Sequence, residues 1–343
     1  MTPETLITGA TGFLGASLAR ALLLRGESLR LLMRPESNRV NLLGLVKHGA
    51  ELCEGSIEDE GVLRQALSGV RRVYHCAAKL SFRKQDRREI WRSNHQGTAG
   101  LAKLAREAGV ERLLHVSSLV AVGACKAGAP PLTEESPYNL ASLRIPYCES
   151  KHAAEQAVLM EHARGLDVVI VNPSLIIGPG DLRGPGDSIL LAIAEGKAPF
   201  LPPGGINVVD VRDVVAGSIA AMESGRSGER YLLGGQNLSH VELARITLRI
   251  LGRQQRLRRL APALYSPLAR IAGLAESFGL VRQPLTGALL RLAAKHIYCD
   301  CSKAEKELGY AAYPIEMAIK ASFDQWLDRD QVSPCIVAGL GRL

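Results

Sequence analysis

The chain has 343 residues, 47% hydrophobic and 22% charged, which excludes disordered and low-complexity classes and suits one large or two smaller domains. Its 42 basic and 34 acidic residues leave a net charge of +8, which is compatible with anionic partners, although simple solubility is the more common explanation. The seven cysteines form no CxxC pattern and the histidines are scattered, which predicts reduced thiols and no metal site. No apolar run is long enough for a membrane span, and the chain begins almost directly with a strand, so we expect a cytoplasmic protein without a signal peptide.

Short aliphatic segments alternate with longer amphipathic ones through the first half of the chain. The predicted strands are Thr5–Thr8, Leu29–Met33, Glu51–Cys53, Arg72–Cys76, Arg112–Ser117 and Asp167–Asn172. The predicted helices are Leu14–Arg25, Glu60–Ala66, Asn94–Glu107 and Glu149–Arg164. This alternation is typical of an α/β fold, a doubly wound parallel sheet that binds ligands at the carboxyl ends of its strands.

The composition changes after Asn172, where residues 178–205 are rich in glycine and proline. From Ser239 onward the chain is mostly helical, so we expect a smaller, mainly helical substrate lobe that is partly interleaved with the first domain. The predicted nucleotide-binding domain covers residues 1–174, with returning segments near 206–235 and 296–301. The predicted lobe covers residues 175–205 and 236–330, and residues 331–343 are expected to form a loose tail.

The first predicted strand runs directly into a glycine-rich turn. Its sequence fits G-x-x-G-x-x-G and reads Thr8-Gly9-Ala10-Thr11-Gly12-Phe13-Leu14-Gly15. Glycine permits a tight turn and close approach to a pyrophosphate, and the helix that begins near Phe13 presents free N–H groups to that anion. A tight turn without a ligand is the alternative, but the position between strand and helix favours dinucleotide binding.

The end of the second predicted strand indicates which dinucleotide is bound. Arg34 lies nineteen positions after Gly15, where NAD-binding proteins carry an acid for the ribose 2′-hydroxyl. A guanidinium suits a 2′-phosphate, and Arg39 could assist, so we expect NADP(H) in preference to NAD(H). A solvated loop arginine is the alternative interpretation.

A candidate catalytic set follows further along the chain. Tyr147 and Lys151 are four residues apart, which places them on one face of a helix, and Ser117-Ser118 closes an earlier strand. A nearby ammonium favours the phenolate and makes a tyrosine useful in proton transfer near neutral pH. A surface Tyr/Lys pair is the alternative, but the order of glycine turn, serine and Tyr-xxx-Lys is much more specific.

In this order the motifs resemble the extended short-chain dehydrogenase/reductase family, which includes NAD-dependent epimerases and dehydratases with a Rossmann fold. Further matching stretches are His75-Cys76-Ala77-Ala78, Asn94-His95-Gln96-Gly97-Thr98, Val116-Ser117-Ser118 and Asn172-Pro173-Ser174. Three more are similar to dihydroflavonol-reductase-like proteins and hopanoid-associated sugar epimerases, with 3-beta-hydroxysteroid dehydrogenases as neighbours: Asn172–Pro179, Gly228–Gly235 and Cys301–Tyr310.

The resemblance implies that Lys151 holds the nicotinamide ribose, Tyr147 exchanges a proton with the substrate oxygen, and Ser118, preferred to Ser117, orients that oxygen. The implied cofactor contacts are Gly9, Thr11, Gly12, Phe13, Leu14, Gly15, Arg34, Arg39, Ser56, Ile57, Ala77, Ala78, Asn94, Tyr147, Lys151, Pro173 and Ser174. The implied substrate contacts are Lys79, Ser118, Asn172 and Leu175. Ser56 stands where the family commonly has an acid near the adenine. A homodimer through helices Asn94–Glu107 and Glu149–Arg164 is also implied.

Two departures from the nucleotide-sugar epimerases favour a reductase. The resemblance places Ile206 where those enzymes carry an arginine, and His296–Cys301 replaces a second arginine motif. Without these clamps for a diphosphate, we expect an NADP(H)-dependent oxidoreductase acting on an apolar carbonyl or secondary alcohol. A nucleotide-sugar epimerase or dehydratase, and a non-catalytic cofactor-binding protein, are the alternatives.

Two basic segments remain. Arg245, Arg249 and Arg253 recur on one helical face within Arg245–Arg259, which is either a solvated face or a weak membrane-surface contact, with nucleic acid disfavoured. Lys79–Arg92 is interpreted as a substrate lid or a variable surface loop with equal weight.

Overall fold

The computed structural model describes residues 3–181, 188–198, 200–277, 286–329 and 332. The strands are β1 (Thr5–Thr8), β2 (Leu29–Met33), β3 (Glu51–Glu54), β4 (Arg72–His75), β5 (Arg112–Val116), β6 (Val168–Pro173), β7 (Leu175–Ile177), β8 (Phe200–Leu201), β9 (Gly205–Asp210), β10 (Arg230–Leu233), β11 (Gln236–Ser239), β12 (Arg258–Arg259) and β13 (His296–Ile297). The helices are α1 (Phe13–Leu24), α2 (Leu43–Lys47), α3 (Glu60–Leu67), α4 (Arg87–Ile90), α5 (Gly97–Glu107), α6 (Pro146–His162), α7 (Ile189–Ala194), α8 (Val211–Ser224), α9 (His240–Ile250), α10 (Pro262–Ser277), α11 (Gly287–Ala293), α12 (Ser302–Leu308) and α13 (Ile315–Asp328).

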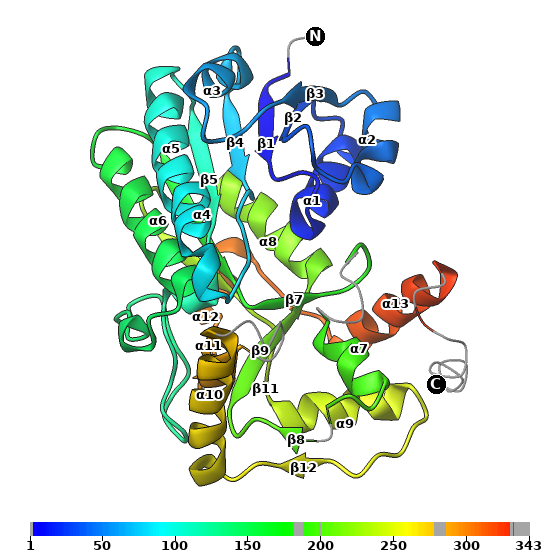
Figure 1. The fold of residues 1–343 in the computed structure, drawn as a ribbon. Helices are drawn as coiled ribbons and strands as arrows, with labels where there is room; N and C mark the ends of the chain where they lie inside the picture. Colours follow the sequence, from blue (N-terminus) through cyan, green and yellow to red (C-terminus); the bar gives the residue numbers. More distant parts are fainter. Residues whose placement is uncertain (1–2, 182–187, 199, 278–285, 330–331, 333–343) are drawn as a thin grey trace.

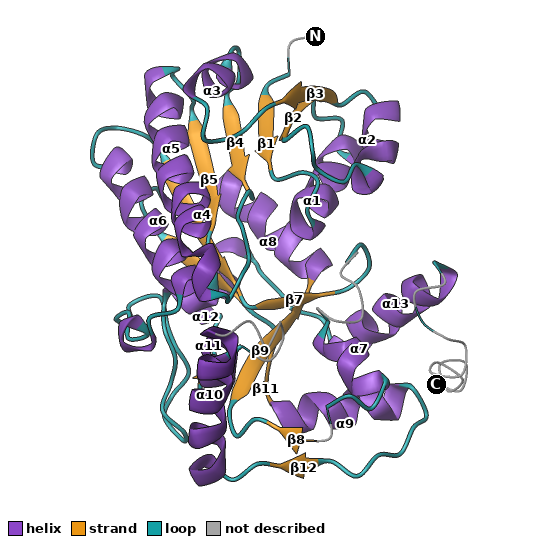
Figure 2. Ribbon diagram, in the orientation of Figure 1, coloured by secondary structure: helices purple, strands orange, loops and turns teal. Residues whose placement is uncertain are grey.

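Seven parallel strands form the large sheet, in the order β10-β6-β5-β4-β1-β2-β3 (Figures 1 and 2). Neighbouring residues of a strand point to opposite faces. Thus Ile7 packs with α1 and α8 in one core cluster, whereas Leu6 packs with α3, α5 and α6 in the other. The predicted doubly wound α/β fold is therefore confirmed.

The element boundaries differ from the sequence prediction at two helices near the site. A π-helical turn (Trp91–Gln96) precedes α5, so the predicted helix from Asn94 is divided into two kinds of turn. The helix predicted from Glu149 begins three residues earlier, because Pro146 occupies its first turn, where a missing N–H costs nothing.

A second sheet has four strands, in which β9 pairs with β11, β13 and β7. It lies below the large sheet in Figure 1. The second half is therefore less exclusively helical than expected, and β9 and β13 join the small sheet rather than returning to the large one. Of the predicted returning segments, β10 reaches the large sheet and α8 packs against it.

The proposed division into domains stays a prediction. The helix α12 lies inside the range assigned to the substrate lobe, but it packs with α8 and β10 beside the large sheet. The predicted tail 331–343 lies outside the described residues except for Val332, which is buried among apolar residues. The homodimer through α5 and α6 also stays a prediction. Within the described ranges no helix is both long enough and apolar enough to cross a bilayer.

Candidate active site

The glycine turn brings the backbones of β1 and β4 into close contact. Gly9 has φ +75°, and a Cβ there would lie 2.6 Å from the Ala77 nitrogen. Gly12 N donates to Gly9 O at 3.0 Å, and a Cβ on Gly15 would collide with the same oxygen. The helix α1 then begins at Phe13 without a side-chain cap or an acid in its first turn. Its N–H groups are thus available to an anion.

The loop after β2 lies beside this turn. Asn41 Nδ2 donates to Thr11 O at 3.1 Å, which ties the loop to the glycine turn. Arg34, the first residue after β2, pairs with Glu36 at 3.3 Å, and Arg39 pairs with Glu54 at 2.8 Å. Both guanidinium groups are about half exposed, so a phosphate must compete with these carboxylates for them.

The predicted adenine contacts follow β3. The Ser56 hydroxyl accepts from Glu58 N at 3.2 Å, which shapes the turn that leads to α3. Ile57 is buried and lines a cavity of about 300 Å³ together with Arg92 and Gln96 of the π-helical turn. These residues lie at the carboxyl end of the sheet, at the same edge as the glycine turn.

Asn94 connects two segments that border the site. Its Oδ1 accepts from Lys79 N at 2.7 Å, and its Nδ2 donates to Lys79 O at 3.0 Å and to Ser150 Oγ at 3.1 Å. The side chain therefore fixes the segment after Ala77-Ala78 against α6, which is a positioning role. The Lys79 ammonium itself pairs with Glu89 of α4. Direct contacts of Asn94 with cofactor and of Lys79 with substrate stay predictions.

The three predicted catalytic residues come from the end of β5 and from α6. Lys151 is 2% exposed, and its Nζ donates to Val116 O at 2.7 Å. Burial lowers the pKa of Lys151 to about 8, although Glu155 counteracts the effect. Tyr147 is half-buried, with Phe82 in edge contact at a ring-centroid distance of 5.8 Å. The half-buried Ser118 follows β5 in extended conformation, at the same end of the sheet.

Glu155 is a buried acid that the sequence analysis missed. It lies on α6 one turn after Lys151, and its carboxylate accepts from Asn172 Nδ2 at 2.5 Å and from Arg230 Nη1 at 3.3 Å. Asn172 Nδ2 also donates to Ser118 O at 3.0 Å. The acid thus joins α6, β6 and β10 behind Lys151. Its spacing of four from Lys151 is the signal that could have identified it.

A second missed feature is a buried hydrogen-bond chain beneath the glycine turn. His75 bonds to the hydroxyls of Thr8 at 2.6 Å and Thr98 at 2.8 Å, and Thr98 donates to Asn94 O at 2.6 Å. Burial, followed by the nearby Lys151 charge, lowers the pKa of His75 to about 3, so this imidazole is neutral. The chain links β1, β4 and the π-helical turn.

Among the buried polar atoms without a hydrogen-bond partner in the described residues, three belong to side chains at or just beyond the ends of β5 and β6. They are Ser117 Oγ, Asn172 Oδ1 and Ser174 Oγ. Buried polar groups are normally satisfied, so these atoms are candidates for hydrogen bonds to a polar ligand. With the glycine turn they fit a nicotinamide dinucleotide: the turn would hold the pyrophosphate, while Lys151, Pro173 and Ser174 would border the nicotinamide half.

The position at which the resemblance places an epimerase arginine lies in the small sheet. Ile206 is the second residue of β9, where it pairs with Leu238 and Ile297 and packs among apolar side chains. The predicted substrate residue Leu175 begins β7, which pairs with the same strand at Val208. The residues around Ile206 are thus apolar rather than cationic.

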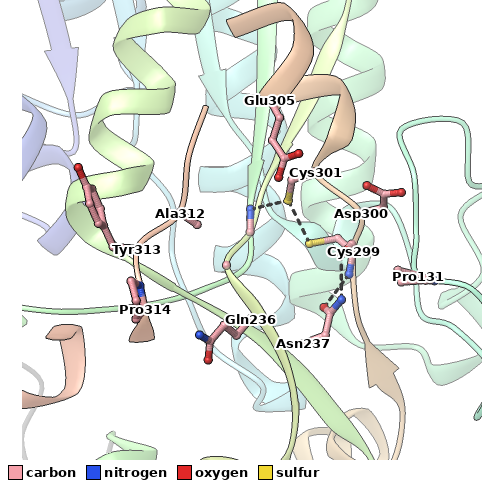
Figure 3. A pocket seen from close by; sticks show the side chains of 12 residues that line it. Pro131, Gln236, Asn237, Cys299, Asp300, Cys301, Glu305, Ala312, Tyr313 and Pro314 are labelled. Atoms are coloured by element: carbon pink, nitrogen blue, oxygen red, sulfur yellow. Dashed lines mark hydrogen bonds between the residues drawn. The ribbon is translucent and has the colours of Figure 1, made fainter. Parts of the chain in front are cut away.

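A separate polar cavity of about 470 Å³ lies between the end of β10 and the start of α12 (Figure 3). Cys299 Sγ and Cys301 Sγ are 3.8 Å apart there, and Gly234 N donates to Cys301 Sγ at 3.2 Å. None of the predicted catalytic or cofactor residues lines it. Across the described residues, no cluster of His, Cys, Asp and Glu side chains is suited to a metal.

Comparisons with known proteins agree with this geometry. The model of the NAD dependent epimerase/dehydratase family matches residues 5–234. Sterol demethylase protein B from Methylococcus capsulatus is 38% identical over 89% of this chain and 92% of its own length. A dihydroflavonol 4-reductase-like protein from Synechocystis is 34% identical over 91% of each chain.

A solved structure with bound NAD shows the same fold. The dTDP-glucose 4,6-dehydratase from Streptomyces venezuelae, solved with NAD and TYD, superposes with a TM-score of 0.76 at 25% identity, over 96% of this chain and 99% of that one. The matched family model spans both the glycine turn and the Tyr-xxx-Lys helix. The chain therefore belongs to the NAD-dependent epimerase/dehydratase family and is an NAD(P)-dependent enzyme of the extended short-chain dehydrogenase/reductase type.

Proposed function

We propose that this enzyme is an NADP(H)-dependent oxidoreductase that acts on an apolar ketone or secondary alcohol. The observation that carries the proposal is the apolar setting of Ile206 in β9, where the resemblance places the diphosphate-binding arginine of the epimerases. A diphosphate needs cationic partners to offset its desolvation, whereas an apolar ring system needs none. The names of the Methylococcus and Synechocystis relatives, a sterol demethylase protein and a dihydroflavonol 4-reductase-like protein, support this class.

The preference for NADP(H) rests on Arg34 and Arg39. Arg34 directly follows β2, and Asn41 holds the loop against Thr11 of the glycine turn. This arrangement supports a contact between either guanidinium and a 2′-phosphate. The partners Glu36 and Glu54 would have to turn away or bind ribose hydroxyls.

The chain's own residues would prepare the proton transfer. When bound, the nicotinamide cofactor supplies or accepts the hydride. The buried Lys151 places a positive charge one helical turn from Tyr147, which favours the phenolate of that tyrosine. Tyr147 then exchanges a proton with the substrate oxygen, and the Ser118 hydroxyl donates to that oxygen and orients it.

An epimerase or dehydratase acting on a nucleotide sugar is the second candidate, favoured by the similarity to the Streptomyces venezuelae dehydratase. The two candidates differ in cofactor turnover. An oxidoreductase consumes one equivalent of NADPH or NADP⁺ per product, whereas an epimerase or dehydratase regenerates the cofactor in each cycle.

The deciding experiment is a substrate panel. NADPH consumption is followed with aldehydes, sterol ketones and flavanonols, and NADP⁺ reduction with the matching alcohols, while products are analysed by mass spectrometry. Nucleotide sugars are incubated in parallel and examined for epimers or dehydration. We expect stoichiometric cofactor oxidation with apolar ketones. Sugar conversion without net cofactor change would overturn the proposal, and so would cofactor binding without turnover of any compound in the panel.

A further inference from the structure

The helix α10 presents two different faces. Tyr265, Ala269 and Ala272 are buried, and a Cβ on Gly287 of α11 would lie 2.6 Å from the Gly273 Cα. The opposite face carries four large apolar side chains that are 44–68% exposed: Leu264, Leu268, Ile271 and Leu274. Their spacing of four, three and three residues forms one stripe along the helix. A contiguous apolar stripe in water marks an interaction surface.

The chain that leads into and through this stripe is strongly basic. From Leu243 to Ala275 the sequence contains seven arginines and no Asp, Glu or Lys. Arg270 lies on α10 itself, and β12, just before the helix, contributes Arg258. Arg256, Arg258 and Arg270 are exposed, and no salt bridge among the described residues includes them. Figure 1 shows β12 and α10 at the end of the molecule opposite the N-terminus.

We propose that the α10 stripe, with its neighbouring arginines, docks on an anionic phospholipid surface. Apolar side chains enter the boundary between headgroups and acyl chains, while arginines pair with lipid phosphates. A second copy of the chain fits this surface less well. A two-fold contact centred on the stripe would bring Arg270 close to its own equivalent, whereas Glu276, the acid of α10, is only partly exposed and already accepts from Lys84 N.

The docking surface is connected to the catalytic helix. Glu276 near the end of α10 accepts from Lys84 N at 3.3 Å, and Phe82, two residues earlier, contacts Tyr147. From α11, Arg291 Nη2 donates to Leu143 O at 3.3 Å in the turn before α6. Docking through α10 would thus hold Tyr147 near the lipid surface. This last step rests on the proposed function, because an apolar substrate partitions into that layer.

Vesicle co-sedimentation without substrate tests the docking separately from catalysis. The full chain is mixed with vesicles of phosphatidylcholine alone or with phosphatidylglycerol added. We expect binding to the anionic vesicles, weakened by salt, and a decrease of at least about tenfold in the variant Leu268→Asp/Ile271→Asp. A charge-reversed variant, Arg258→Glu/Arg270→Glu, should lose the preference for phosphatidylglycerol.

Leu24→Asp is the matched control, because Leu24 is an exposed apolar residue (83%) at the end of α1. It should bind like the wild type, and all variants should keep the wild-type melting temperature. Absence of vesicle binding, or full binding by Leu268→Asp/Ile271→Asp, would overturn the proposal. Sedimentation velocity without lipid tests the alternative that a second copy of the chain binds the stripe. If the wild type is a dimer and Leu268→Asp/Ile271→Asp is a monomer, the stripe is a dimer interface. These binding measurements contain no substrate, so their outcome does not depend on the proposed reaction.

Discussion

Glu155 lies one helical turn after Lys151 on α6, and both charged side chains are buried at 1% and 2% exposure. The carboxylate raises the pKa of the Lys151 ammonium, which burial lowers. Glu155 also accepts hydrogen bonds from Asn172 and Arg230, so its charge is fixed by three elements. We interpret Glu155 as a positioning residue that keeps Lys151, the proposed catalytic lysine, protonated.

Glu155→Gln should therefore change the pH dependence of the reaction. Loss of the negative charge lowers the pKa of Lys151 further. In a plot of kcat/KM against pH, the decrease on the alkaline side should therefore begin about one pH unit lower. Glu161→Gln is the matched control: Glu161 is a buried acid on the same helix, paired with Arg106 and Arg164. An unchanged limb in Glu155→Gln would reduce the residue to a purely structural role.

Lys151→Met should show how burial of the ammonium affects stability. The pKa of Lys151 is about 8 in the folded chain, against its ordinary value of 10.5. Between these values the unfolded chain binds more protons, so the wild-type free energy of unfolding rises with pH. Below pH 8 the full penalty is present, on the order of 3 kcal/mol.

The Met variant lacks this penalty, so its stability relative to wild type should be greatest below pH 8 and should decline up to pH 10.5. Urea unfolding at several pH values measures the difference. Lys103→Met on α5, an exposed lysine, should show no such trend. Parallel stability curves for Lys151→Met and wild type would contradict the pKa assignment.

The sequence could predict the parts of this site that are local in the chain. The glycine turn and the Tyr147/Lys151 pair each lie within one turn or helix, so their spacing alone indicates their geometry. The contacts of Glu155 could not be predicted in this way, because Asn172 and Arg230 reach it from β6 and β10. Strand order in a parallel sheet is not encoded in local spacing.

The small sheet was missed for a similar reason. Its strands β7 and β13 are three and two residues long, too short to show a period of two in the sequence. The π-helical turn at Asn94 was missed because nothing in its residue pattern differs from an α-helix. Its side-chain bonds to Lys79 and Ser150 are tertiary contacts.

Gly9→Ala should destabilise the fold and abolish cofactor binding. The new Cβ would lie 2.6 Å from Ala77 N, so β1 or the segment after β4 must shift. Gly26→Ala is a matched control, because Gly26 has a similar φ of +81° and nothing within 4 Å of the added Cβ. The control should lose only about 1–2 kcal/mol from the left-handed conformation. Thermal melts with and without NADPH measure both effects, and equal losses would remove the close-approach argument.

Tyr147→Phe should remove proton transfer while keeping the cofactor. Because the ring still packs against Phe82, we expect the melting temperature and the NADPH dissociation constant to remain near wild type. Turnover should decrease by about 100- to 10,000-fold, the usual contribution of a general acid or base. Tyr313→Phe, an exposed tyrosine, is the control and should keep full turnover. Near-normal turnover in Tyr147→Phe would contradict the catalytic assignment.

Arg34→Ala should weaken NADPH binding by about tenfold and leave NADH binding nearly unchanged, because only NADPH carries the 2′-phosphate. Arg25→Ala is the matched control: it removes a similarly exposed arginine, which directly follows α1 and pairs with Glu223 of α8. Glu36→Gln should act in the opposite direction and tighten NADPH binding, because Glu36 competes for the Arg34 guanidinium. Fluorescence titration of both cofactors against the three variants measures these changes. Equal weakening of NADPH and NADH in Arg34→Ala would show that this arginine does not distinguish the two cofactors.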